Sequence, residues 1–191
     1  MIYSGKFKVT SPFGKRTLNG VSEDHPGIDV VGLDSKYICA VVPGVVVISQ
    51  IVKDKADRSW EWGNYVCIRG DDGRYYYYCH MAQRLVDVGK RVKAGDHLGI
   101  EGNTGSVSPA PKSEDDKTSG RHCHFEVRNG ANVAIEPSGF IGAENKVGTY
   151  GIDYRDEAKK RFGLSEDTMR YLDRYKYAAD LYRKLNEHSS F

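Results

Sequence analysis

The sequence predicts a mainly β fold, with an antiparallel core of sheet or sandwich type and a small α-helical appendage at the C-terminus. Three observations predict it. Short runs of alternating apolar and polar residues, separated by turn residues, extend through residues 1–140 without a helical period. The composition is rich in glycine (21) and tyrosine (13), which favour turns and strands. After Gly151, apolar residues recur at helical intervals.

Four segments of the first 140 residues have the pattern of strands that border a turn. They cover residues 41–49, 64–70, 74–81 and 122–129. Asp72-Gly73 lies between the second and the third, and this dipeptide is a strong hairpin signal. Two polar stretches, 53–61 and 106–119, predict loops, and the second is rich in proline, serine and charged residues. A loop of that length in a small domain is either functional or disordered.

The C-terminal part carries its own start and stop signals for helices. Asp153 and Ser165 are predicted N-caps, and Gly163 is suited to end the first helix. Apolar residues then recur at helical intervals up to Leu185. These signals predict two or three short helices within residues 152–188.

Length, charge and hydropathy exclude several classes of protein. The chain has 191 residues, enough for one domain and a short appendage. Its 28 Lys and Arg against 26 Asp and Glu give a net charge of +2, too balanced for an electrostatic nucleic-acid binder. The longest apolar stretch, residues 38–48, is broken by Pro43-Gly44 and is too short for membrane insertion. Four cysteines lie far apart without a CxxC pair, which predicts buried thiols.

Several of the six histidines are placed where they could act together. His25 and Asp29 are separated by Pro26-Gly27, which forbids a regular helix. In an extended strand their Cα atoms would be about 13 Å apart, but a bend at Pro-Gly can bring imidazole and carboxylate together. His122 and His124 are two residues apart, so a strand places both on one face with Cα atoms about 7 Å apart.

Each setting also has an ordinary explanation. His122 and His124 could be two surface histidines, and His80 could be a partly buried histidine at a strand end, on the same face as Tyr76 and Tyr78. Together with Asp29, the histidines offer three N or O ligands and spare imidazoles for proton transfer. A catalytic zinc site needs three such ligands and an open position. Spacing alone leaves open which three would bind the metal.

The order of the motifs resembles the M23 zinc metallopeptidases, the lysostaphin/LytM-type peptidoglycan endopeptidases. The resemblance covers about two thirds of the chain, from Val9 to Gly139. The motifs that carry it are TSPFGKR (10–16), HPGID (25–29), PGVVV (43–47), GNYVCI (63–68), YYCHM (77–81), VDVGKRVKAGDHLGIEGNTG (86–105) and GRHCHFEVR (120–128). The stretch 106–119 departs from the family, in which this segment is usually short, and could either rim the substrate groove or be a mobile loop.

Carried over position by position, the resemblance implies one zinc ion per chain, bound by His25, Asp29 and His124. It implies that His80 and His122 are catalytic: one would take a proton from the attacking water and the other would stabilise the oxyanion. The division of these two roles stays open.

The resemblance also implies the domain organisation and the activity. Residues 1–145 would form the zinc peptidase domain, with the insertion at about 106–119, and residues 146–191 a helical region of unknown role. The expected activity is hydrolysis of peptide bonds in bacterial peptidoglycan, in the stem peptide or the cross-bridge. Two alternatives remain: a non-catalytic zinc-binding, virion structural or wall-binding module on the same scaffold, and a D,D-carboxypeptidase.

The N-terminal residues show no readable secretory signal, so we expect synthesis in the cytoplasm and action on the cell wall. Release through a holin, or carriage in a virion, would bring such an enzyme to its substrate. This expectation favours a phage or prophage origin, such as an endolysin or tail-associated lysin. The C-terminal helices are expected either to cap the β domain or to dock on a wall or virion.

Overall fold

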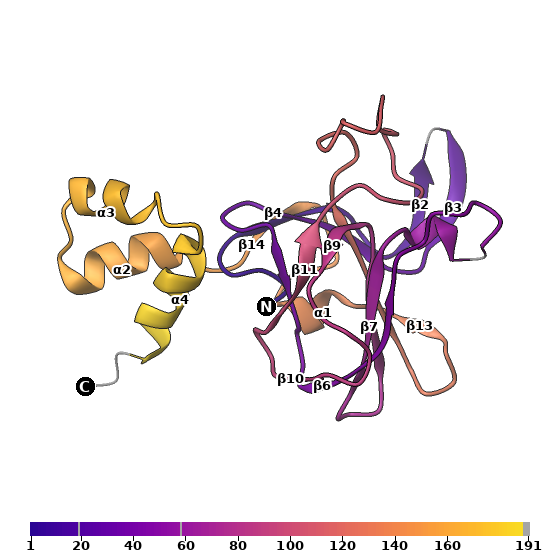
Figure 1. Cartoon of the computed structure of the whole chain (residues 1–191), viewed down its shortest axis with the longest axis horizontal. Coiled ribbons are helices and arrows are strands. Elements are labelled where there is room, and N and C mark those ends of the chain that lie inside the picture. The colour runs from indigo at the N-terminus through magenta and orange to yellow at the C-terminus, as the bar shows by residue number, and fades with distance from the viewer. Residues whose placement is uncertain (19, 58, 189–191) are drawn as a thin grey trace.

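The computed structural model describes residues 1–18, 20–57 and 59–188 and confirms a mainly β fold followed by helices (Figure 1). Fourteen strands lie within this described part and form three sheets. The strands are β1 (Phe7–Ser11), β2 (Gly14–Leu18), β3 (Val21–His25), β4 (Ile28–Gly32), β5 (Tyr37–Cys39), β6 (Gly44–Gln50), β7 (Tyr65–Gly70), β8 (Tyr75–Tyr78), β9 (Met81–Arg84), β10 (Arg91–Val92), β11 (His97–Glu101), β12 (Cys123–Arg128), β13 (Ala134–Ile135) and β14 (Gly148–Tyr150).

The central strands of the largest sheet carry residues that the sequence predicts for the metal site. Its order is β10-β6-β7-β8-β12-β4-β1-β14, with β13 paired to β12, and every pair is antiparallel. In this register His124 of β12 lies opposite Asp29 of β4, and Phe125 lies opposite Tyr78 of β8. His124 and Asp29 are therefore brought together by strand pairing and not by a loop.

Successive side chains of β8 point to opposite faces of the sheet and therefore enter two different hydrophobic clusters. Tyr76 and Tyr78 are fully buried in the main core together with Phe125, whereas Tyr77 packs into a second cluster. The main core also contains side chains of the three-stranded sheet, whose order is β5-β11-β9. The four cysteines are buried and unpaired, as predicted.

The face of the strand predicted for His80 is wrong. The sequence places His80 on the face of Tyr76 and Tyr78, but β8 ends at Tyr78 and His80 has a φ of 61°. Strand alternation therefore does not extend to His80, which lines a groove while the two tyrosines enter the core. The predicted hairpin turn is confirmed, because β7 and β8 are antiparallel and Gly73 has a φ of 80°.

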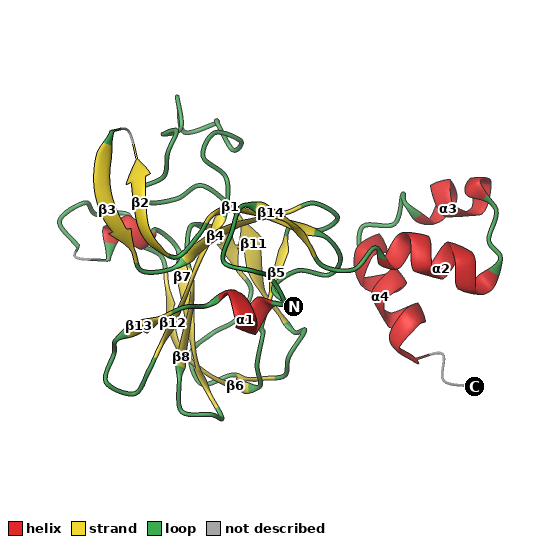
Figure 2. Ribbon diagram, turned by 180° about the vertical axis from the view of Figure 1, so that it is seen from behind, coloured by secondary structure: helices red, strands yellow, loops and turns green. Residues whose placement is uncertain are grey.

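Three helices follow the sheet and form a group at one end of the molecule, away from the β2–β3 hairpin (Figures 1 and 2). The helical elements are the 3-10 turn η1 (Trp60–Trp62), α1 (Ser138–Ile141), α2 (Tyr154–Phe162), α3 (Glu166–Leu172) and α4 (Ala178–His188). The predicted caps are confirmed: Asp153 accepts from the N–H of Asp156, and Ser165 from that of Thr168. Gly163 ends α2 in the left-handed conformation.

Polar contacts join the helical segment to the β part. Asp180 of α4 is buried and accepts hydrogen bonds from Ser4 and from His97 Nε2, the latter at 2.8 Å. Lys6 Nζ lies 2.7 Å from Asp153. β14 pairs with β1, so the large sheet extends past residue 145. The division into domains at that residue stays a prediction.

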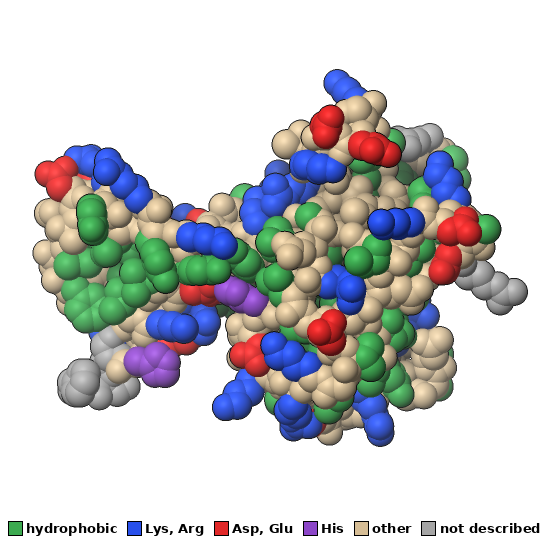
Figure 3. All heavy atoms as spheres, viewed as in Figure 1, with side chains coloured by type: hydrophobic (Ala, Val, Ile, Leu, Met, Phe, Trp, Pro, Cys, Tyr) green, Lys and Arg blue, Asp and Glu red, His purple; other side chains and the backbone are tan. Residues whose placement is uncertain are grey.

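The outer surface of the helices carries hydrophobic side chains, which gather there in a continuous area (Figure 3). Tyr171 and Tyr175 are exposed by 73% and 55%. None of the described helices is both long and apolar enough to cross a membrane.

The stretch 106–119 forms a loop without strands or helices, held by its own hydrogen bonds. Asp116 Oδ1 accepts from the backbone N–H groups of Thr118 and Ser119, and Oδ2 accepts from that of Lys112. Asn103 Nδ2 donates to the carbonyls of Asp116 and Ser119. The loop therefore has a defined conformation beside the groove.

Candidate metal centre and active site

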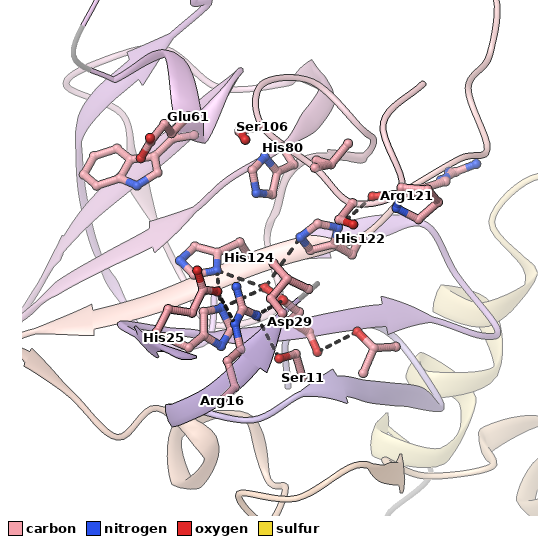
Figure 4. A pocket seen from close by; sticks show the side chains of 18 of the residues that line it. Ser11, Arg16, His25, Asp29, Glu61, His80, Ser106, Arg121, His122 and His124 are labelled. Carbon is pink, nitrogen blue, oxygen red and sulfur yellow. Dashed lines mark hydrogen bonds and ion pairs between the residues drawn. The ribbon is translucent and has the colours of Figure 1, made fainter. Parts of the chain in front are cut away.

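A groove of about 1190 Å³ runs over the central strands (Figure 4). One wall is the β2–β3 hairpin and the other is the loop at residues 106–110. Residues 106–110 therefore lie at the rim of this groove, and the role of the whole stretch 106–119 stays a prediction. All five predicted site residues line it: His25, Asp29, His80, His122 and His124.

The bend predicted in HPGID brings His25 and Asp29 together. β3 ends at His25, β4 begins at Ile28, and His25 Nε2 lies 3.2 Å from Asp29 Oδ1. Gly27 is required at the bend because a Cβ atom there would lie 2.6 Å from the carbonyl of Phe125 and 2.7 Å from the ring of His124. The glycine lets the chain pass directly beside His124.

His124 completes a triangle of ligand atoms. Its Nδ1 lies 2.9 Å from Asp29 Oδ1 and 3.0 Å from His25 Nε2. A tetrahedral zinc ion with bonds of 2.0–2.1 Å separates its ligand atoms by about 3.3 Å. The three edges, 2.9–3.2 Å, therefore need to open only slightly to hold such an ion. Among the described residues this is the group of His, Cys, Asp and Glu side chains suited to a metal.

The outer hydrogen bonds fix which nitrogens face the centre. His25 Nδ1 lies 2.8 Å from the carbonyl of Pro12, and His124 Nε2 lies 3.0 Å from the carboxylate of Glu126. Both partners are acceptors, so these nitrogens carry the protons. His25 Nε2, His124 Nδ1 and Asp29 Oδ1 then face one another as three acceptors. Such a cluster is stabilised by a cation at its centre, either a metal or a proton.

The pKa values of His124 and Asp29 indicate that a proton can occupy the centre of the triangle. Although burial lowers it, hydrogen bonds with Asp29 and Glu126 raise the pKa of His124 to about 9. Although burial raises it, the interactions with the imidazoles of His124 and His25 hold the pKa of Asp29 well below its usual range. At neutral pH a metal ion must therefore displace a proton from His124, so binding should release protons.

His80 is held in an unusual backbone conformation next to this triangle. Its φ of 61° is uncommon for a residue with a side chain. Its backbone N–H donates to the carbonyl of Trp62, and its ring Nδ1 donates to the carbonyl of Thr104, each at 2.8 Å. Burial, with the neighbouring His122 and His124, lowers the pKa of His80 to about 3. Its imidazole is therefore neutral at pH 7, and Nε2 carries no proton.

His122 has the same tautomer as His80. Its Nδ1 donates to the carbonyl of Gly120 at 2.7 Å, and its Nε2 lies 3.5 Å from Asp29 Oδ1. The ring centroids of His80 and His122 are 4.6 Å apart, so the two imidazoles form a pair beside the triangle. A reacting group at the triangle would lie within reach of both.

Two residues of the site have no role in the sequence-based prediction. Glu126 orients His124 and is itself held by Arg128 Nε at 2.6 Å. Strand alternation could have found it, because residues 124 and 126 share one face of β12. Arg16 donates to Asp29 Oδ2 at 3.0 Å, and only the register of β2–β3 brings it there.

Three acceptor atoms suited to a metal, flanked by the imidazoles of His80 and His122 in a groove, define a candidate metal-dependent hydrolase. The profile of Peptidase family M23 matches residues 23–137. The chain therefore belongs to this family.

Individual relatives agree with the family. The chain is 34% identical over 122 residues to the peptidoglycan DD-endopeptidase ShyC of Vibrio cholerae, covering 62% of this chain and 24% of the relative. The catalytic domain of prophage-encoded M23 protein EnpA from Enterococcus faecalis has a TM-score of 0.52 and 29% identity, over 69% of this chain and 88% of that domain. The catalytic domain of lysostaphin from Staphylococcus simulans has a TM-score of 0.53 and 25% identity, over 71% and 92%. The chain spans about a quarter of the length of the curated relatives it matches.

Proposed function

We propose that the chain is a zinc-dependent endopeptidase that hydrolyses peptide bonds in bacterial peptidoglycan. The observation that carries the proposal is the triangle of His25 Nε2, Asp29 Oδ1 and His124 Nδ1, with edges of 2.9–3.2 Å, beside His80 and His122. Membership of a peptidase family supports hydrolysis of a peptide bond. The named activity of ShyC supports peptidoglycan as the substrate class.

The chemistry divides between the metal and the two histidines. A bound zinc ion would supply a Lewis acid for the scissile carbonyl and lower the pKa of water towards about 7. His80 and His122 each keep Nε2 free because Nδ1 donates to a backbone carbonyl. One of them would accept the proton of the attacking water, and the other would stabilise the oxyanion. A comparison of the pH–rate profiles of His80→Ala and His122→Ala would assign these two roles.

Digestion of purified sacculi tests the proposal. We expect the zinc-loaded protein to open cross-links or stem peptides, as seen by loss of turbidity and by mass spectrometry of the released muropeptides. A chelator should abolish the reaction and zinc should restore it. His122→Ala should keep one zinc per chain and lose about 10²- to 10⁴-fold in rate.

Other outcomes identify the alternatives. Release of terminal D-Ala alone, with cross-links intact, would make the protein a D,D-carboxypeptidase. Zinc binding without hydrolysis of any wall type would make it a non-catalytic module on the same scaffold. Sacculi from several wall types are needed, because the shape of the groove decides which bond is cut.

We further propose that helices α2–α4 dock on the wall or on a virion. The hydrophobic area on the helices and the exposed Tyr171 and Tyr175 support this role, because contiguous exposed apolar patches mark interaction sites. The double variant Tyr171→Ser/Tyr175→Ser should bind sacculi or virions less while its hydrolysis of soluble muropeptides is unchanged. Equal binding would contradict docking through this surface.

Phage or prophage origin and holin-type release form a separate proposal, supported by the similarity of the chain to the prophage-encoded M23 protein EnpA. The genomic region around the coding sequence tests it. Lysis or virion genes alongside would agree with it, and an in-frame signal sequence upstream would contradict it.

A further inference from the structure

Arg16 is fixed from three directions at the edge of the triangle. On β2 it lies opposite Glu23 of β3, and its Nε donates to Glu23 Oε1 at 2.7 Å. Its Nη1 donates to Ser11 Oγ at 2.8 Å and to Asp29 Oδ2 at 3.0 Å. The side chain is only 21% exposed. Figure 4 shows the guanidinium pointing towards Asp29 from the hairpin side.

The two oxygens of Asp29 have different partners. Oδ1 faces the imidazole nitrogens of His25 and His124, whereas Oδ2 accepts from Arg16. A charge-assisted hydrogen bond of this kind is strong and directional. It keeps Oδ2 away from the centre, so that Asp29 offers a metal ion one oxygen instead of two.

One oxygen from Asp29 matters for the proposed chemistry. A catalytic zinc site has three protein ligands and keeps its fourth position open. If both oxygens of Asp29 bound the metal, the position needed by substrate or water would be occupied. The hydrogen bond from Arg16 to Oδ2 disfavours this arrangement.

We propose that Arg16 is a positioning residue of the metal centre, which holds Asp29 Oδ2 and so makes Asp29 a one-oxygen ligand. The inference rests on the proposed metal site. It also connects the hairpin to that site, because β2 and β3 pair only with each other among the described strands. A two-stranded hairpin is marginally stable by itself, so the Arg16–Asp29 contact and His25 at the end of β3 are its anchors.

Charge and geometry predict opposite effects at Arg16, which makes the test decisive. The guanidinium repels a dication, so a residue that acted only through its charge would weaken metal binding. Removing that charge would then tighten binding. A positioning residue predicts the reverse, since partners that orient ligands are worth about 10- to 100-fold in metal affinity.

The experiment measures the zinc dissociation constant of the metal-free protein by competition with a chromophoric chelator. We expect Arg16→Gln to bind zinc about 10- to 100-fold more weakly. Arg16→Lys keeps the charge but cannot bridge Ser11, Glu23 and Asp29 together, so it should also bind more weakly. Lys15→Gln is the matched control, because Lys15 is the exposed neighbour on the opposite face of β2 and should stay within twofold.

Hydrogen exchange gives a second readout. Zinc should slow amide exchange over residues 14–25 in the wild type and in Lys15→Gln, and should do so less in both Arg16 variants. Zinc affinity within twofold in both Arg16 variants, or tighter binding by Arg16→Gln, would overturn the proposal. If Arg16→Gln does not fold, the zinc affinity of Arg16→Lys alone tests the proposal. Weaker binding supports it, and affinity within twofold of the wild type overturns it. A wild type that binds zinc but does not hydrolyse peptidoglycan would contradict the proposed function and leave this inference standing.

Discussion

Replacement of Glu126 by glutamine should weaken zinc binding while leaving the fold intact. Glu126 is fully buried, and its two oxygens accept from His124 Nε2 at 3.0 Å and from Arg128 Nε at 2.6 Å. Glutamine has almost the same shape but only one acceptor oxygen. It can therefore satisfy one of these donors and must turn an N–H₂ group towards the other.

The expected magnitude follows from these contacts. The carboxylate fixes the tautomer of His124, raises its basicity and places a negative charge in direct hydrogen bond with the ligand ring. Loss of such a partner typically costs 10- to 100-fold in metal affinity, which corresponds to about 1.4–2.8 kcal/mol. The pKa of His124 should fall below its value of about 9, because Glu126 is one of the groups that raise it.

The assay is a competition titration of the metal-free protein with a chromophoric zinc chelator at one fixed pH. Glu61→Gln is the matched control, since Glu61 lines the same groove but is exposed. Circular dichroism and the melting temperature check that the metal-free variant folds. A zinc dissociation constant for Glu126→Gln within twofold of the wild type would refute the reasoning that Glu126 orients His124.

Three more predictions concern other parts of the molecule. His80→Ala should keep one zinc per chain and lower the turnover of muropeptides by about 10²- to 10⁴-fold; loss of zinc would instead make His80 a ligand. Asp116→Ala removes three backbone hydrogen bonds, so hydrogen exchange over 106–119 should accelerate and KM should rise more than kcat falls; unchanged exchange would contradict this. The hydrogen bond to Asp180 raises the pKa of His97 to about 10. Its stabilisation is complete below an unfolded pKa of about 6.5 and is lost as pH rises towards 10. Denaturation at pH 6 and pH 9 should show this loss, and His97→Asn should reduce it.

Local sequence patterns predicted the parts of the fold that depend on neighbours in the chain. Asp153, Gly163 and Ser165 cap helices in the structure because a cap needs only the adjacent turn. The Pro-Gly bend brings His25 to Asp29 for the same reason, since four residues decide that geometry. Each of these interactions joins residues that are only a few positions apart in the sequence.

Contacts between distant segments could not be predicted in this way. The bond from Arg16 to Asp29 requires the register of a hairpin and its approach to β4. His80 escapes the alternation of β8 because its left-handed conformation is fixed by Trp62 and Thr104, which come from other segments. The ordered loop at 106–119 depends on a buried Asn103 that the composition of the loop does not reveal.

The position of a metal ion tests the central claim most directly. Anomalous diffraction at the zinc edge from crystals of the zinc-loaded protein should show one strong peak per chain. We predict that this peak lies about 2.0–2.2 Å from each of His25 Nε2, Asp29 Oδ1 and His124 Nδ1, with Asp29 Oδ2 still bonded to Arg16. A peak at another histidine, or zinc held by both oxygens of Asp29, would contradict the account.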